Sequence, residues 1–170
     1  MKRFKIFDMI KCFFQKKSDR CEGCRLEQAA MSLPYGIKEN AEALINDVLE
    51  PVREEYGKPI LVVNGFICPA RMKNNGSPHV KGEAADIMAA GLTGSDLWLE
   101  NLELAKVVMK VGHFDMMVLG DVPSDSIEPK WIKVTWKRNG TNMGMVLKKV
   151  AGKAEYESLS KLDMMQLEAD

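Results

Sequence analysis

Residues 76–87 read GSPHVKGEAADI, and this stretch decides how the middle of the chain folds. A polar, glycine-containing loop leads into a short strand, which we expect over residues 84–88. His79 lies on the loop, and Asp86 follows seven residues later within the strand. An imidazole nitrogen and a carboxylate are both normal zinc ligands, but a catalytic zinc site needs three protein ligands and an open position for water. The pair is therefore an incomplete site by itself.

The segments on either side of this stretch alternate between helical and extended patterns. A helix is expected over residues 39–56, because apolar side chains recur there at helical spacing; Pro51 should kink or divide it, and Gly57 should end it. A second helix should run from an N-cap at Ser95 to Gly112. Further strands are expected at residues 60–63, 114–119, 131–137 and 143–149, the last two joined by a turn at Asn139-Gly140, and a terminal amphipathic helix at 154–167. This order predicts an α+β fold.

Length and composition favour one globular domain with short additions at both ends. The 170 residues are 46% hydrophobic and 28% charged, which is typical of a globular protein. Lys and Arg total 24, as do Asp and Glu, so the basic surface expected of a nucleic-acid-binding protein is not indicated. We predict a basic amphipathic N-terminal segment and linker over residues 1–32, the main domain over 33–150 and a helical tail over 151–170.

The N-terminal segment has a pattern of its own. Its apolar residues fall about three apart with lysines between them, which predicts a short basic helix that packs on the domain or contacts a membrane surface. Charged residues interrupt every apolar run, so neither a signal peptide nor a transmembrane segment is expected. The apolar positions are Phe4, Phe7, Ile10 and Phe13.

Four cysteines leave two interpretations open. Cys21 and Cys24 form a C-x-x-C pair, which is half of a four-ligand zinc site, and Cys12 and Cys68 could complete it. Without a matched second pair, free thiols explain the same residues, and the sequence does not tell the role of Cys21 and Cys24.

Several short motifs together resemble a known family. PVR at residues 51–53, GKP at 57–59, NGF at 64–66, the stretch 76–87, FD at 114–115 and WIKV at 131–134 occur in order. Over roughly residues 36–147 the chain resembles the zinc D-alanyl-D-alanine carboxypeptidases and phage endolysin peptidases. The resemblance implies a small antiparallel sheet flanked by helices, zinc as cofactor, and peptidoglycan stem peptides as substrates. Since no signal peptide is read from the sequence, we expect a cytoplasmic or phage-associated protein.

Carried over to this chain, the family's zinc site is only partly present. In the family the metal is held by a His, an Asp and a second His. His79 and Asp86 match the first two ligands, whereas Lys133 stands where the second histidine is expected. A lysine at neutral pH is a cation without a free lone pair, so it repels zinc. An alternative role for Lys133 is that its ammonium replaces the charge of zinc and pairs with Asp86.

The residue that activates water is also missing from its expected position. In the family a glutamate follows the strand that begins with Phe-Asp, and the matching residues here are Leu119 and Gly120, neither of which accepts a proton. A bulge could bring in the neighbouring Asp121. Among substrate-contacting positions, the resemblance points to Ser77, Arg71 and Trp131, with Arg71 replacing a cation that relatives carry earlier in the chain.

Two functional hypotheses follow. The first is a peptidase-like domain that does not hydrolyse peptides, and instead binds a peptidoglycan peptide or a protein partner. The second is an active zinc metallopeptidase that cleaves stem peptides with a rearranged ligand set. It would use His79 and Asp86, with Cys68 or His113 as third donor and Asp121 as base. His113 also reads as an exposed residue between a helix and a strand, about seven residues and roughly 20 Å along the strand from the base position.

Overall fold

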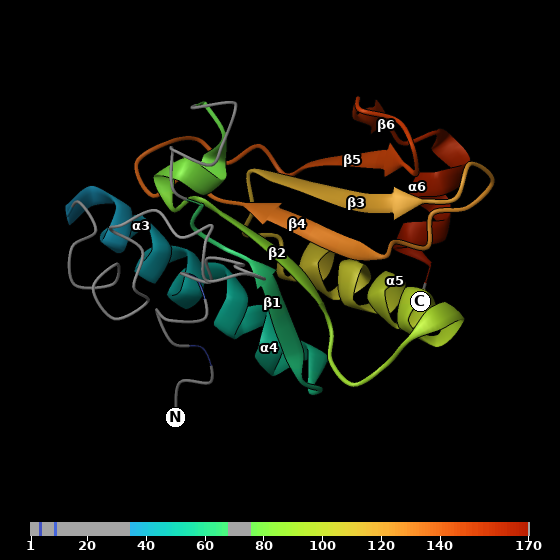
Figure 1. Cartoon of the computed structure of the whole chain (residues 1–170), viewed down its shortest axis with the longest axis horizontal. Coiled ribbons are helices and arrows are strands. Elements are labelled where there is room, and N and C mark those ends of the chain that lie inside the picture. The colour runs from blue at the N-terminus through green and yellow to red at the C-terminus, as the bar shows by residue number, and fades with distance from the viewer. Residues whose placement is uncertain (1–3, 5–8, 10–34, 68–75, 170) are drawn as a thin grey trace, which may run out of the picture.

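A computed structural model of the chain describes residues 4, 9, 35–67 and 76–169 (Figure 1). The elements are α3 (Tyr35–Leu44), the π-helical turn η2 (Ile45–Leu49), α4 (Glu50–Tyr56), β1 (Ile60–Asn64), the 3₁₀ turn η4 (Pro78–Lys81), β2 (Ala84–Ala89), α5 (Gly94–Val111), β3 (Met116–Val122), β4 (Trp131–Thr135), β5 (Met145–Val150), β6 (Glu157–Ser158) and α6 (Lys161–Glu168). The predicted α+β class is confirmed, and so is a mainly antiparallel sheet flanked by helices.

The six strands form one sheet in the order β1-β2-β4-β3-β5-β6. All neighbours are antiparallel except β3 and β5, which run parallel. The prediction of a hairpin through Asn139-Gly140 is wrong, because β4 pairs with β2 on one edge and with β3 on the other. The loop after β4 is instead closed by Asn142, whose side-chain amide bonds both the N–H and the carbonyl of Lys137.

The predicted first helix is continuous but has three parts. The π-helical turn η2 interrupts it directly before α4, and Pro51 lies in the first turn of α4, where a missing N–H is tolerated. Gly57 ends α4 in the left-handed conformation, as predicted. The prediction of Ser95 as an N-cap is wrong, because α5 already begins at Gly94 and Thr93 precedes it in extended conformation.

The helices and the alternation along the strands define two unlike faces of the sheet. Helices α4 and α5 pack against one face (Figure 1). On β2 and β4, alternate residues point into that core: Ala85, Ile87, Ile132 and Val134. The residues between them belong to the opposite face, which we call the site face: Asp86 on β2, with Trp131 and Lys133 on β4. Strand alternation therefore directs the apolar side chains to the core and the polar and aromatic side chains to the site face.

The ends of the described chain contact the same core. Phe4 and Met9 are buried in it, whereas the rest of the predicted N-terminal helix lies outside the described residues. Leu167 of α6 is also buried there, and α6 begins with a capping box in which Ser160 and Asp163 bond each other's backbone N–H. None of the described helices has the length and apolar character needed to cross a membrane.

Candidate functional site

The pairing of β2 with β4 brings Asp86 and Lys133 together. The two residues are directly opposite each other in the antiparallel register, and their side chains leave the sheet on the same face. Lys133 Nζ lies 3.9 Å from Asp86 Oδ1. Both side chains are largely covered, with 15% of Lys133 and 11% of Asp86 exposed. Strand register alone therefore places a cation beside this carboxylate.

His79 reaches the same carboxylate from the turn η4. Its Nε2 lies 3.3 Å from Asp86 Oδ1, and the residue is only 1% exposed. Gly82 closes the turn at φ 72°, a left-handed conformation that glycine adopts without strain. A side chain at this position would meet the Ile37 carbonyl of α3 at 2.6 Å. The close approach of α3 thus fixes the turn that carries His79.

Two neighbours at the end of β1 orient the pair. Asn64 donates a hydrogen bond from Nδ2 to Asp86 Oδ2 over 2.9 Å. The Gly65 carbonyl lies 2.6 Å from His79 Nδ1 and accepts a hydrogen bond from it, which leaves Nε2 facing Asp86. Such backbone contacts are those that orient metal-ligating histidines in proteins.

The Asp86 carboxylate is ionised despite its burial. Removal from water raises its pKa, but the adjacent His79 ring, the Lys133 ammonium and the Asn64 amide together outweigh this effect and hold the pKa below its usual value. Oδ1 itself, however, accepts no hydrogen bond of normal geometry from the described residues. One carboxylate oxygen thus faces an imidazole nitrogen and an ammonium without a directed bond to either.

The Lys133 ammonium has further partners. It donates a hydrogen bond to the hydroxyl of Tyr156, just before β6, over 3.2 Å. It also lies 5.7 Å from the centre of the Trp131 ring and 5.8 Å from that of Tyr156, within cation–π range. A carboxylate, a hydroxyl and two aromatic rings therefore surround this one cation.

The expected position of the catalytic base holds no acid. Leu119 is fully buried in the core, and a side chain at Gly120 would meet the Trp131 ring at 2.2 Å. The sheet is bulged between Gly120 and Val122, as the sequence allowed, and Asp121 adopts φ 52°. Trp131 packs over Gly120, so the ring occupies the space that a base at this position would need.

Asp121 is held by other groups. Its carboxylate accepts hydrogen bonds from Trp131 Nε1 at 3.3 Å and from Lys149 Nζ at 3.1 Å. Burial raises its pKa, but the Lys149 ammonium and the Trp131 indole lower it further, so the pKa lies below its usual value. A carboxylate with a lowered pKa is a weak general base at neutral pH.

Several predicted residues are not part of this cluster. Arg71, Cys68 and the other three cysteines lie outside the described residues. Ser77 stands immediately before η4, and its side chain makes no capping hydrogen bond. His113 is exposed between α5 and β3. The structure therefore brings together His79, Asp86, Lys133 and Trp131 out of the residues predicted from the sequence.

The donors present do not fit a catalytic zinc ion. Two ligands about 2.0–2.2 Å from zinc at the tetrahedral angle stand roughly 3.3–3.5 Å apart, and His79 Nε2 and Asp86 Oδ1 have this spacing. The third neighbour, Lys133, brings a positive charge in place of a lone pair. Across residues 4, 9, 35–67 and 76–169, no three His, Cys, Asp or Glu side chains are grouped so as to hold a metal.

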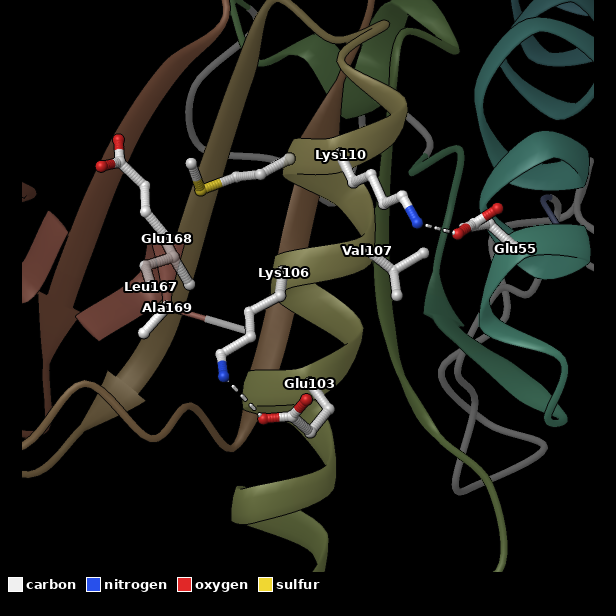
Figure 2. Close-up of a pocket in the computed structure, with 9 residues that line it drawn as sticks. Glu55, Glu103, Lys106, Val107, Lys110, Leu167, Glu168 and Ala169 are labelled. Atoms are coloured by element: carbon white, nitrogen blue, oxygen red, sulfur yellow. Dashed lines mark hydrogen bonds and ion pairs between the residues drawn. The ribbon is translucent and has the colours of Figure 1, made fainter. Parts of the chain in front are cut away.

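A hollow lies on the helical side of the molecule, away from the site face. It has a volume of about 490 Å³ and lies between α4, α5 and α6 (Figure 2). Two ion pairs lie in its lining, the exposed pair of Lys110 with Glu55 and the half-buried Lys106 with Glu103. The charges of these four side chains are therefore matched in pairs within the lining.

Sequence reasoning missed the residues that support the site from outside. Asn64 and Gly65 were recognised as part of a family motif but were not assigned to the site, although the pairing of β1 with β2 sets Asn64 opposite Asp86. Tyr156 carried no signal, because it reaches Lys133 from a segment that was predicted as part of a helix. Strand pairing would have identified Asn64, whereas only the three-dimensional path of the C-terminal segment identifies Tyr156.

Comparison with known proteins gives one match. A family model described as Peptidase M15 matches residues 16–116, more than half of the chain. This range includes His79 and Asp86 and ends before Lys133. Neither the curated proteins nor the solved structures contain a match.

Proposed function

Because the chain belongs to the Peptidase M15 family, we propose that it is a peptidase-like domain that does not hydrolyse peptides and binds a peptidoglycan peptide on its site face. The observation that carries this proposal is the Lys133 ammonium, 3.9 Å from Asp86 Oδ1, where the resemblance calls for a third zinc ligand. A zinc ion held by His79 and Asp86 alone would lack the ligand count of a catalytic site.

The missing base supports the same proposal independently. A hydrolytic zinc site needs an acceptor for the proton of the attacking water. Gly120 offers none, and Asp121 is engaged by Lys149 and Trp131. A bound metal ion alone would therefore not give hydrolysis, because no acceptor for the proton of water would be present.

The site face keeps groups suited to recognising a peptide. Trp131 offers an aromatic surface that is partly exposed, and the Lys149 ammonium, which also pairs with Asp121, lies 5.9 Å from its ring. Aromatic residues next to a cation are favourable contacts for a peptide chain that ends in a carboxylate. Binding without turnover needs these groups and does not need a metal.

Hydrolysis is tested with the full chain, zinc and a stem peptide that ends in D-alanyl-D-alanine. We expect no more released D-alanine than from a His79→Ala/Asp86→Ala variant. Zinc-dependent release by the unmodified chain, abolished in that variant, would overturn the proposal and support the alternative, an active metallopeptidase with a rearranged ligand set.

Binding is tested by sedimentation with insoluble peptidoglycan. We expect the chain to bind, and Trp131→Ala to bind about 5–30-fold more weakly, the loss typical of a truncated aromatic hot spot. Trp98→Ala, on the helical side, is the matched control and should bind like the original chain. If the folded chain does not bind, peptidoglycan is not its ligand, and a protein partner becomes the alternative.

A further inference from the structure

We propose that the Lys133 ammonium is the resident cation of this site, which takes over the charge of a metal ion and makes the arrangement of His79 and Asp86 independent of metal. This inference deepens the proposed function, since both take Lys133 to stand at the third ligand position. Different measurements test the two proposals: peptide hydrolysis tests the proposed function, and metal uptake tests the role of Lys133 as resident cation.

The Asp86 carboxylate needs a positive charge beside it. The residue is 8% exposed and lies on a central strand, β2, between β1 and β4. An ionised carboxylate in such a position is costly unless a cation or several donors accompany it. Asn64 satisfies Oδ2, so the remaining demand falls on Oδ1, which faces His79 and Lys133.

The groups around the Lys133 ammonium all favour a cation. Besides Asp86, it contacts the Tyr156 hydroxyl and the faces of two aromatic rings. Carboxylate oxygen, hydroxyl oxygen and aromatic faces all attract an ammonium, and none of them attracts a neutral group as strongly. The chain thus supplies cation-binding groups from β2, from β4 and from the segment before β6.

The two potential ligands lie at ligating distance beside this cation. His79 Nε2 and Asp86 Oδ1 remain 3.3 Å apart, and Gly65 and Asn64 fix the far sides of both groups. Two imidazole or carboxylate donors at this spacing form one edge of a zinc tetrahedron. A third donor at position 133 would therefore complete a three-ligand set that the present chain lacks.

The variant Lys133→His tests this directly, because it exchanges the resident cation for a donor. We expect it to bind one zinc ion per chain, with a Kd at least about 100-fold lower than that of the original chain, since even loss of an outer-shell partner changes metal affinity by 10–100-fold. Calorimetry measures the affinity, and cobalt substitution reports tetrahedral coordination through its visible absorption. Adding His79→Ala to the variant should abolish both signals.

Thermal unfolding gives a second measurement that needs no enzymatic activity. The melting temperature of the original chain should not change with zinc or with a chelator, whereas that of Lys133→His should rise with zinc because the metal binds only the folded state. Lys133→Arg is the matched control, since it keeps a cation without a lone pair and should gain no zinc response.

The proposal is overturned if the original chain binds stoichiometric zinc and loses it on His79→Ala. It is equally overturned if a folded Lys133→His takes up no more zinc than the original chain. Should Lys133→His fail to fold, nuclear magnetic resonance of the unmodified chain still decides. The Lys133 methylene protons next to Nζ should be shifted upfield by the Trp131 and Tyr156 rings, and unshifted protons would refute the arrangement.

Discussion

Two lysine–carboxylate pairs on opposite sides of the sheet differ mainly in how much water reaches them. On the site face, the Lys133 and Asp86 side chains are 15% and 11% exposed and 3.9 Å apart. In the helical groove, Lys110 and Glu55 are 71% and 42% exposed and only 2.5 Å apart. Distance alone would rank the groove pair as the stronger.

Burial reverses that ranking. A solvated pair gains little, because water and salt screen its attraction and two long side chains must be ordered. A covered carboxylate that loses its cation has no water to replace it. Removal of one partner should therefore cost much more on the site face than in the groove, although the shorter contact is in the groove.

The largest effect is expected from Lys133→Met, which leaves Asp86 charged, covered and without its ammonium. Breaking a buried pair from one side costs about 3–5 kcal/mol, and the partial exposure here places the loss near the lower end. The double variant Asp86→Asn/Lys133→Met should recover part of it, because the stranded charge is gone. Urea unfolding of the original chain, Lys133→Met, Asp86→Asn and the double variant measures the coupling between the two side chains; losses that simply add would show that they do not interact.

A steric test of the site face should have the next largest effect. Gly120→Ala places a methyl group 2.2 Å from the Trp131 ring, and the ring must move. Such overpacking costs about 1–3 kcal/mol. Gly36→Ala in α3 is the matched control, since nothing lies within 4 Å of its added carbon and alanine favours a helix. Equal stability of the two variants in thermal unfolding would show that Trp131 is not held over Gly120.

The fold was predictable where local patterns decide, and the site was predictable only in part. Gly57 correctly predicted the end of α4, and the two motifs around His79 and Lys133 identified the central residues of the site. The hairpin through Asn139-Gly140 failed because a turn signal is local, whereas strand partners are chosen by the whole sheet. β5 instead pairs in parallel with β3, which no short motif encodes.

The missing part of the site is non-local in the same way. Tyr156 lies 23 residues from Lys133, and its hydroxyl reaches the ammonium only because β6 pairs with β5. Asn64 meets Asp86 across 22 residues through strand register. Ligand types can be recognised in a motif, but the groups that orient them depend on how distant strands align.

A pH effect of intermediate size is expected on the helical side at Glu100. Hydrogen bonds from Lys58 and Tyr56 hold its pKa below the usual 4.5. The stabilisation is therefore fully present above pH 4.5 and is lost as the pH falls through the lower folded-state pKa, because the unfolded chain binds the proton first. Glu100→Gln should lose about 1 kcal/mol at pH 7, the discounted value for a pair with an exposed lysine. In urea unfolding from pH 7 to 3, the free energy of unfolding should fall less steeply with acid in the variant than in the original chain. Equal slopes would show that the contacts of Glu100 with Lys58 and Tyr56 do not stabilise the fold.

The smallest effect should come from Glu55→Gln in the groove, which removes the carboxylate facing Lys110 (Figure 2). An exposed pair contributes about 0–0.5 kcal/mol at low salt, and at 1 M salt the Debye length of about 3 Å removes most of that. The variant and the original chain should therefore unfold alike in 1 M sodium chloride and differ only slightly in dilute buffer. Lys133→Met, measured in the same two buffers, should keep most of its loss at high salt, since ions do not reach a covered pair. If salt erased both losses equally, burial would not be what separates the two faces of this sheet.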